Sequence, residues 1–223
     1  MASEKGTRRR ARRAPLSRER VLRAAIELAD EGGLEALTMR RLGHALGVEA
    51  MSLYNHVANK DEILDGIVDL VLGEVELPPG GDWREAVRRC ALSAYDALLR
   101  HPWACSVAMG SPRILPARFR YIEWVLRRFR EAGFSPELTF HAYHALDSHI
   151  LGFTLWEVGH AIDTDDLPGL VERFFSELPA GAYPYLAEHA EQHIAGIGRE
   201  GEGEFAFVLD LLLDSLERAR DAS

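Results

Sequence analysis

The chain has 223 residues, 47% of them hydrophobic, which is enough to bury a sizeable core in one large or two small domains. No run approaches the ~18 apolar residues of a membrane span, and the charged N-terminus excludes a secretory signal, so we expect a cytoplasmic protein. The net charge is −9, but residues 1–60 are basic, with 12 Lys and Arg against 7 Asp and Glu, and the rest of the chain is acidic. DNA would repel the acidic part, so any nucleic-acid surface is expected within residues 1–60.

Residues 1–16 have too little apolar content to fold alone, so the sequence predicts a disordered basic arm. Its basic residues are Lys5, Arg8, Arg9, Arg10, Arg12 and Arg13. One interpretation is an arm that lies along DNA and enters the minor groove. The alternative is a tail that only adds solubility.

A helix is predicted over about 18–31, with Ser17 placed to cap its first turn and Gly32-Gly33 placed to end it. Every third or fourth residue between them is apolar, which gives the helix one face to bury.

Residues 38–60 predict two short helices joined by a tight turn and followed by a longer helix. Thr38 can cap the first helix, and Gly47 stands where that helix ends with a positive φ. The apolar residues that would pack the two helices together are Met39, Leu42, Leu46, Val48, Met51 and Leu53. The outer side of the second helix keeps small or polar residues, namely Glu49, Ala50, Ser52, Tyr54, Asn55 and His56. So short a helix needs rigid neighbours, and its free outer face suits the DNA major groove.

The longer helix has Asn59 as its cap and Glu62 in the reciprocal capping position. We expect it to end at Pro78-Pro79-Gly80-Gly81, the clearest break in the chain. The break separates a DNA-binding domain at 17–80 from a second domain at 81–223. This helix is a natural transmission element, because it belongs to the first domain and its far end touches the second.

The second domain is predicted to be wholly helical, so the expected fold class is all-α. Its helices are expected at about 82–100, 103–109, 115–132, 136–162, 167–178, 183–194 and 204–220. Cys90 and Cys105 fall in apolar helical contexts, and we interpret them as core residues of a protein in a reducing cytosol.

The segment from Leu37 to Lys60 resembles the helix-turn-helix of the tetracycline-repressor (TetR) family. The resemblance is carried by Leu37-Thr38-Met39-Arg40-Arg41-Leu42, Leu46-Gly47-Val48, Leu53-Tyr54-Asn55-His56-Val57 and Asn59-Lys60. Gly43 departs from the family, in which alanine is usual there, at a cost of about 1 kcal/mol of helix propensity. Glu49 departs as well, because a serine or threonine cap is common, so we expect the second helix to fray at its start.

The resemblance implies DNA contacts for the exposed residues. The positions equivalent to phosphate contacts are Thr38, Tyr54, His56 and Lys60, and those that face base edges are Arg40, Ala50, Met51 and Ser52, with Asn55 on the same outer face. Arg40 is suited to a forked contact with guanine, worth about 1–3 kcal/mol of discrimination. The alternative for each of these residues is a solvated surface position.

Beyond residue 80 the chain resembles the tetracycline-repressor-like C-terminal class. The resemblance rests on helix order, His101-Pro102-Trp103, Gly133-Phe134-Ser135-Pro136 and the C-terminal leucine run. In that class the last helix and the long helix near 136–162 build a four-helix dimer interface. The last helix is apolar on nearly two faces, so one face can be buried while the other needs a partner. The expected interface residues are Phe205, Val208, Leu209, Leu212, Leu213 and Leu216.

Polar groups among the apolar residues of the long helix predict a cavity for a small ligand. The candidate ligand-binding residues are Tyr95, Trp103, Met109, Tyr121, Trp124, Tyr143, His144, Asp147, Phe153 and Trp156. The alternative is that these side chains belong to the core.

Two other hypotheses compete with a ligand cavity. His141 and His144 are spaced i and i+3, and with Asp147 and His149 they suggest a metal site in a sensor or enzyme. The other hypothesis is a DNA-binding dimer with no small ligand, which a core without a cavity of about 300 Å³ would favour.

Together these features predict a homodimeric, ligand-responsive transcriptional repressor of double-stranded operator DNA. Its effector is an unknown small molecule, and no cofactor, metal or membrane is expected. An enzyme is not expected, because the chain lacks His-Glu-x-x-His, Gly-x-Ser-x-Gly, a phosphate-binding glycine loop and Cys-x-x-Cys. Release of DNA on ligand binding is implied by the family alone.

Overall fold

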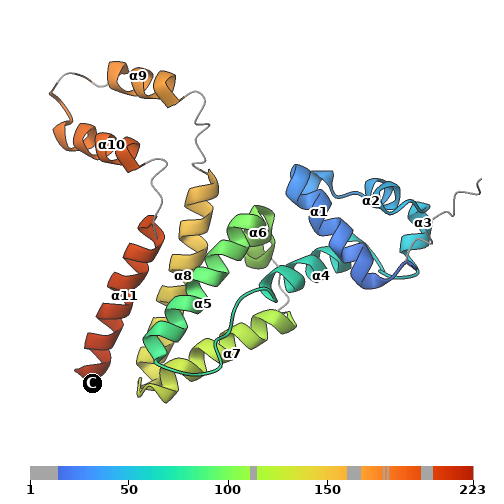
Figure 1. The fold of residues 1–223 in the computed structure, drawn as a ribbon, viewed down its shortest axis with the longest axis horizontal. Helices are drawn as coiled ribbons and strands as arrows, with labels where there is room; N and C mark the ends of the chain where they lie inside the picture. The colour runs from blue at the N-terminus through green and yellow to red at the C-terminus, as the bar shows by residue number, and fades with distance from the viewer. Residues whose placement is uncertain are drawn as a thin grey trace, which may run out of the picture. The chain divides into compact units, whose positions relative to one another are not determined.

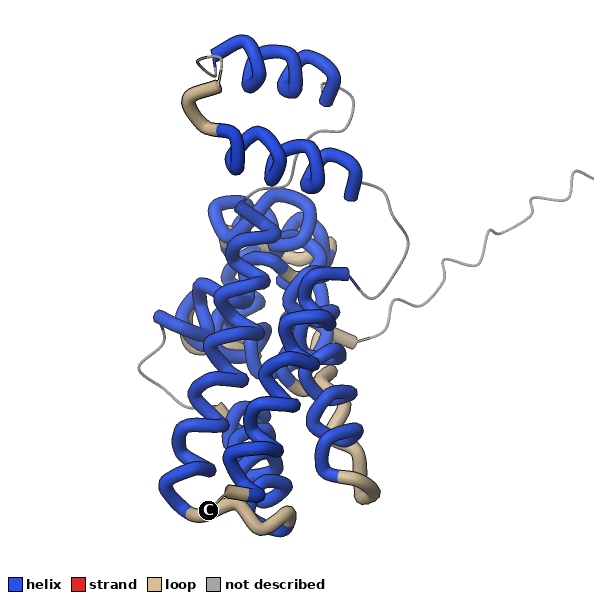
Figure 2. The backbone as a smooth tube through the Cα atoms, turned by 90° about the vertical axis from the view of Figure 1, so that its left-hand side faces the viewer, coloured by secondary structure: helices blue, strands red, loops and turns tan. Residues whose placement is uncertain are grey.

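The structure is a computed structural model that describes residues 15–110, 115–159, 167–177, 179, 181–196 and 203–222. Every regular element in these residues is a helix (Figure 1, Figure 2), so the predicted all-α class is confirmed. The chain divides into two compact units, Met1–Leu70 and Val71–Ser223. The predicted basic arm, with Lys5, Arg8, Arg9, Arg10, Arg12 and Arg13, lies outside the described residues.

Helix α1 (Arg18–Ala36) opens the first unit and contains the predicted break. The Ser17 hydroxyl accepts a hydrogen bond from the Arg20 N–H at 3.3 Å and caps the helix, as expected. Gly33 has a φ of 67° and Gly32 is also non-helical, so the regular helix stops where the sequence predicted and one more turn follows.

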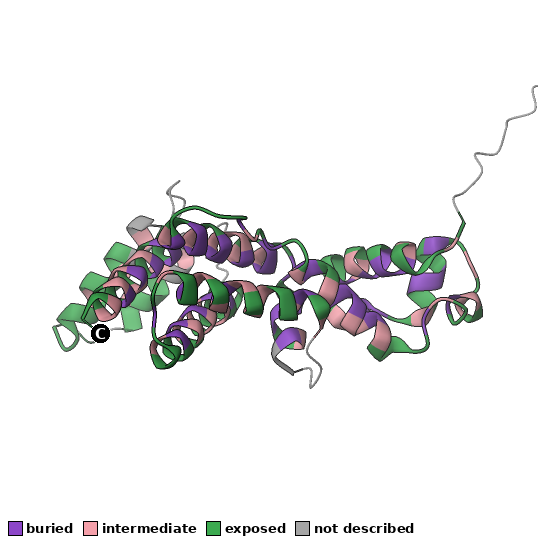
Figure 3. Ribbon diagram, turned by 90° about the horizontal axis from the view of Figure 1, so that it is seen from below, coloured by how far each residue is buried: buried purple, intermediate pink, exposed green. Residues whose placement is uncertain are grey.

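Helices α2 (Met39–Leu46), α3 (Ala50–Leu53) and α4 (Lys60–Leu72) follow in this unit. Helix α1 packs on α2, and α2 packs on α3. The buried faces of these helices turn toward one another (Figure 3). The fully buried side chains include Leu37, Leu42, Leu53, Ile63 and Ile67, so the short helices are held by a common core.

Helix α4 is shorter than predicted, because it ends at Leu72 and not at the Pro78–Gly81 break. Gly73 follows directly, and glycine is about 1 kcal/mol less favourable than alanine in a helix. The two compact units divide between Leu70 and Val71, inside α4, whereas the sequence prediction placed the division after residue 80.

The segment after α4 runs without regular structure along the second unit. The Glu76 N–H donates to the Ser93 hydroxyl at 2.9 Å, and Trp124 Nε1 donates to the Pro78 carbonyl at 3.1 Å. These side chains take the place of the helical hydrogen bonds that the predicted longer helix would have made.

Helix α8 (Pro136–Gly159) is the central helix of the second unit. It packs against α5 (Trp83–Arg100), α6 (Pro102–Gly110), α7 (Pro116–Glu131) and α11 (Gly203–Asp221), and α5 also packs against α6, α7 and α11. Asp82 caps α5, since its side chain accepts the Glu85 N–H at 3.0 Å, and Ser135 caps α8, since its hydroxyl accepts the Leu138 N–H at 3.1 Å. The fully buried residues of this core include Val87, Cys90, Cys105, Phe129, Phe134, Leu146, Leu209 and Leu213.

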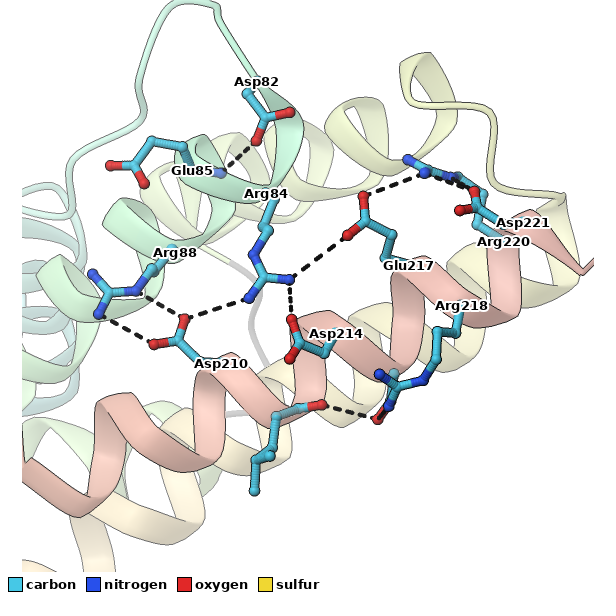
Figure 4. A network of polar contacts seen from close by, with 12 residues as sticks. Asp82, Arg84, Glu85, Arg88, Asp210, Asp214, Glu217, Arg218, Arg220 and Asp221 are labelled. Carbon is cyan, nitrogen blue, oxygen red and sulfur yellow. Dashed lines mark hydrogen bonds and ion pairs between the residues drawn. The ribbon is translucent and has the colours of Figure 1, made fainter.

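Charged side chains fix α11 against α5 (Figure 4). Arg88 donates from Nε and Nη2 to the two carboxylate oxygens of Asp210 at 2.9 and 3.3 Å. Arg84 pairs with Asp214 and lies 3.8 Å from Glu217. Each pair is partly exposed and contributes at most about 1 kcal/mol, but together they select one face of α11 for contact with α5.

Helices α9 (Leu167–Glu177) and α10 (Pro184–Gly196) contribute no buried side chain among the residues whose burial is described. Several of their large apolar residues are exposed, including Phe174, Tyr185 and Leu186. Among the described helices, none is both long enough and apolar enough to cross a membrane.

Candidate DNA-binding surface and ligand cavity

The turn between α2 and α3 is rigid. The Thr38 hydroxyl accepts the Arg41 N–H at 3.2 Å, which confirms the predicted cap of α2. Gly47 has a φ of 68°, a conformation that glycine adopts without strain, and the Val48 N–H donates to the Gly43 carbonyl at 2.9 Å.

Gly43 lies at the tightest approach within this turn. A Cβ at this position would lie 2.9 Å from the Val48 carbonyl oxygen and 3.1 Å from the Ala50 nitrogen. Helix propensity alone therefore gives an incomplete account of this glycine, because its missing side chain is what lets α3 sit close to α2.

Helix α3 has a single turn, and its first residues lack a side-chain cap. Glu49 makes no capping hydrogen bond, as the sequence predicted. Leu53 is fully buried and holds the turn to the core, whereas Met51 is 75% exposed. The prediction that Met51 packs α3 onto α2 is therefore wrong, and its side chain lies on the outer face with Ser52 and Tyr54.

The residues predicted to contact DNA lie in the first unit with surfaces open to solvent. Thr38, Arg40, Met51, Tyr54, Asn55 and Lys60 are exposed, and Ala50, Ser52 and His56 are half-buried. Arg40 is near the start of α2 and Lys60 is the first residue of α4, so the candidate phosphate and base contacts come from three neighbouring helix starts. Helix N-termini favour phosphate because their first N–H groups lack helical partners.

Glu62 holds the start of α4 in place. Asn59 Oδ1 accepts the Glu62 N–H at 2.8 Å, and Glu62 in return accepts the Ala58 N–H at 2.7 Å. Its second carboxylate oxygen accepts from Arg18 Nε of α1 at 3.1 Å. The Ala58 N–H and then Arg18 lower the pKa of Glu62, so the carboxylate that joins α1 to α4 is ionised at neutral pH.

The second unit contains a cavity of about 40 Å³. Its walls are mainly aliphatic, and the lining residues are Leu72, Val75, Ala94, Leu98, Ala108, Arg118, Tyr121, Asp147, Ile150 and Leu151. A space of this size holds about three water molecules and is well below the ~300–1,000 Å³ of pockets for drug-sized ligands.

The polar end of the cavity is formed by Arg118 and Tyr121 of α7 and Asp147 of α8. Asp147 Oδ2 lies 3.9 Å from Arg118 Nη2 and accepts a long hydrogen bond of 3.5 Å from the Tyr143 hydroxyl. Arg118 Nη1 donates to the Ala108 carbonyl at 2.7 Å. Burial raises the pKa of Asp147, and the positive charge of Arg118 opposes this effect.

The Tyr121 hydroxyl is buried and has no hydrogen-bond partner among the described residues. Burial, and then the charge of Asp147, raise the pKa of Tyr121 well above its usual value, so the phenol stays protonated. A buried hydroxyl without a hydrogen-bond partner is uncommon in folded proteins, so the Tyr121 hydroxyl is a candidate group for binding a ligand.

Two family profiles account for most of the chain. The profile for bacterial regulatory proteins of the tetR family matches residues 21–67, and that for the tetracyclin repressor-like C-terminal domain matches residues 76–220. The chain belongs to the TetR family. It is a transcriptional regulator whose DNA-binding element is the helix-turn-helix of α2 and α3.

Individual TetR-family proteins match along most of their lengths. The HTH-type transcriptional repressor DrrR1 of Streptomyces coeruleorubidus is 33% identical, over 95% of this chain and 82% of the relative. The class D tetracycline repressor of Escherichia coli is 35% identical, over 70% of this chain and 72% of the relative. The crystal structure of ActR from Streptomyces coelicolor in complex with actinorhodin superposes with a TM-score of 0.72, at 27% identity, over 93% of this chain and 99% of ActR.

In this TetR-family chain only part of the predicted ligand set reaches the cavity. Tyr121 and Asp147 line it, and Tyr143 contacts Asp147. Met109 has a side chain outside the described residues, and the others, Tyr95, Trp103, Trp124, His144, Phe153 and Trp156, are absent from the cavity lining. Two of these residues pack against α11 instead, because the Tyr95 ring stacks on Phe205 and the Phe153 ring meets Phe205 edge-on.

Sequence reasoning missed Arg118 and most of the aliphatic wall. Arg118 is one of several arginines on α7, so residue type alone does not distinguish it from Arg120 or Arg127. The signal that was available is the i, i+3 pair Arg118 and Tyr121, which places a charge and a phenol on one face of α7.

The alternative metal site of His141, His144, Asp147 and His149 does not form. His141 and His144 are exposed, and the His144 ring packs on Phe140 with centroids 4.4 Å apart. His149 Nε2 instead contacts the Phe205 carbonyl oxygen at 3.0 Å. Within the described part of the chain, no three His, Cys, Asp or Glu side chains gather to hold a metal ion.

The predicted dimer residues of α11 need correction. Phe205, Leu209, Leu213 and Leu216 are buried in their own unit, so they are core residues and cannot supply an exposed surface. Val208 is 40% exposed and Leu212 is half-buried. The apolar residues that α11 leaves open are instead Phe207, Val208 and Leu211.

Proposed function

We propose that this TetR-family protein is a homodimeric repressor that holds operator DNA through α2, α3 and the start of α4. The observation that carries the proposal is a short helix fixed by Leu53 in the core while Met51 and Tyr54 remain exposed. Two such units in a dimer read half-sites about 34–36 Å apart in a pseudo-palindrome. The names of its relatives as repressors support repression as the direction of control.

Homodimerisation is supported by exposed apolar surface on α8 and α11, two helices that pack against each other. The large exposed apolar residues on these helices are Phe140, Leu155, Trp156, Val158, Phe207, Val208 and Leu211. Apolar surface exposed on two helices that pack together favours association, and two copies can bury each other's exposed residues in a symmetric interface.

We further propose that a small molecule bound in the cavity releases the DNA. The support is that the structural relative ActR was crystallised in complex with actinorhodin, and that Leu72 and Val75 line the cavity here. These residues form the end of α4 and the chain that follows it, so a ligand that widens the cavity displaces the end of α4. The coupling between ligand and DNA is typically about 1–3 kcal/mol.

The DNA-binding proposal is tested by a gel-shift assay on DNA upstream of the protein's own gene. Tyr54→Ala and Lys60→Ala should weaken binding, and Lys60→Ala should lower the salt slope by about one unit because one phosphate contact is lost. Tyr185→Ala, at a position 83% exposed on α10, is the matched control. Binding by Tyr54→Ala and Lys60→Ala that equals the wild type would reject the assignment of the DNA surface.

One observation favours a second candidate function, a DNA-binding dimer without a small ligand. The cavity of about 40 Å³ is small for an effector pocket. The two candidates differ in a thermal-shift screen over metabolites and drugs, because only a ligand-responsive protein is stabilised by a compound that also reduces DNA binding. Stabilisation with no effect on DNA binding at saturation would favour the second candidate.

A further inference from the structure

The polar end of the cavity is incompletely satisfied. The Asp147 carboxylate has a hydrogen bond of 3.5 Å from Tyr143 and an Arg118 nitrogen at 3.9 Å. Charged carboxylates normally draw nitrogen donors to about 2.7–2.9 Å, so both contacts are long. The buried Tyr121 hydroxyl has no partner among the described residues. The Tyr121 hydroxyl opposes the rise in the pKa of Asp147, so it lies near that carboxylate, although without a hydrogen bond of normal geometry. A ligand group placed between the two therefore finds one acceptor and one phenol that both lack a close partner.

The charge balance limits which group fits there. Arg118 already faces Asp147, and their opposite charges leave this end of the cavity close to neutral. A ligand ammonium would meet the Arg118 guanidinium, and a ligand carboxylate would meet Asp147, so either charged group brings a like charge into a partly desolvated site. A hydroxyl carries no charge, and it donates to Asp147 while it accepts from the Tyr121 hydroxyl.

We propose that the effector is an uncharged, mainly apolar molecule that places an alcohol or phenol hydroxyl between Asp147 and Tyr121. The aliphatic walls, with Leu98, Ile150 and Leu151, take its apolar body. This inference rests on the proposed ligand response and adds the chemical class of the ligand. Binding widens the cavity on the side of the irregular segment after Leu72, which lies outside the regular helices.

The test is calorimetric titration of the full chain with four probes that share one ring system. They are 2-naphthol, naphthalene, 2-naphthoate and protonated 2-naphthylmethylamine. We expect 2-naphthol to bind at least about tenfold more tightly than naphthalene, the effect of satisfying one buried polar group. We also expect 2-naphthol to bind more tightly than either charged probe. Equal binding of 2-naphthol and naphthalene, tightest binding of a charged probe, or no binding of 2-naphthol would each overturn the proposal.

Variants identify the groups responsible. Tyr121→Phe and Asp147→Asn should each reduce the preference for 2-naphthol over naphthalene about tenfold. Asp147→Asn should in addition bind 2-naphthoate more tightly than the wild type does, because Arg118 then has no opposing carboxylate. Tyr95→Phe is the matched control, since the Tyr95 ring stacks on Phe205 and is not part of the cavity lining. An unchanged preference in Tyr121→Phe, with helix content unchanged, overturns the proposal.

The outcome for the ligand class is separable from that for the repressor. Probe binding is measured without DNA, and operator binding is measured without probe. Loss of the hydroxyl preference with intact operator binding overturns the ligand class alone. Tight, hydroxyl-dependent binding of 2-naphthol by a chain that binds no operator would instead support the ligand class and reject the repressor.

Discussion

Replacement of Gly43 by alanine sets two effects of opposite sign against each other. Alanine is favoured over glycine by about 1 kcal/mol inside a helix, so α2 considered alone becomes more stable. In the folded unit the new methyl carbon would lie 2.9 Å from the Val48 carbonyl oxygen and 3.1 Å from the Ala50 nitrogen. Both atoms belong to the backbone, so neither can rotate away as the end of a side chain does.

The steric effect should win. Forcing an extra methyl into a well-packed site typically costs about 1–3 kcal/mol. The upper part of that range applies because the turn is also held by the bond from the Val48 N–H to the Gly43 carbonyl at 2.9 Å. After the gain in helix propensity, we expect the first unit to lose about 1–2 kcal/mol. Relief of the contact moves α3, so operator affinity should fall as well.

Two spectroscopic signals separate the units during urea denaturation. The four tryptophans are Trp83, Trp103, Trp124 and Trp156, all in the second unit, so their fluorescence follows that unit, while circular dichroism follows both. Gly43→Ala should shift the dichroism transition to lower urea and leave the fluorescence transition in place.

Gly66→Ala is the matched control for this experiment. A Cβ at Gly66 would meet the terminal methyl carbons of Leu22 at 2.8 and 2.9 Å, and these can move by a change of rotamer. The control should therefore lose less stability than Gly43→Ala. The reasoning is refuted if Gly43→Ala raises the free energy of unfolding, or if both variants lose the same amount.

Three further predictions concern the second unit. Leu213→Ala should lower the free energy of unfolding by about 2–5 kcal/mol because Leu213 is buried. Leu211→Ala should change the free energy of unfolding by under about 0.5 kcal/mol, because Leu211 is exposed, and should shift the sedimentation of the protein toward that of a monomer. The opposite pattern would restore the interface predicted from the sequence. Burial lowers the pKa of His149 below its usual 6.5, so the unfolded chain takes up the proton first as the pH drops. The free energy of unfolding, measured by urea denaturation, should therefore fall as the pH drops through 6.5, and the His149→Gln variant should not show this loss. Asp210→Asn should lower stability by about 1 kcal/mol at low salt and by less at high salt, since its partner Arg88 is only partly buried; a loss independent of salt would contradict the ion-pair account.

The helix starts could be predicted because capping depends on residues close in sequence. Ser17, Thr38, Asn59, Asp82 and Ser135 each accept a backbone N–H three residues further on. The same local logic located the left-handed glycines at positions 33 and 47. These features require no knowledge of which helices meet, so spacing and residue type are sufficient.

The cavity could be predicted only in part because its walls depend on which helix faces converge. Successive residues of α8 turn by about 100°, so the residues between 141 and 149 point in different directions. Asp147 faces Arg118 of α7, and His149 faces Phe205 of α11, while His144 lies on the surface against Phe140. These residues are close together in the sequence but lie in three separate environments. They therefore do not share a metal ion, and only the Asp147 carboxylate lies at the cavity.

The rotation of α11 shows what decides between two apolar faces. Hydrophobic spacing leaves the choice open, because both the face with Leu213 and the face with Leu211 are apolar. The acidic residues settle it, since Asp210 and Asp214 are spaced i and i+4 and meet Arg84 and Arg88 of α5, which have the same spacing (Figure 4). Unpaired charges beside a core are costly, so the rotation that pairs both acids is the one that buries Leu213. Apolar patterns therefore fix which helices are amphipathic, and the charges at the edge of each face fix which face turns inward.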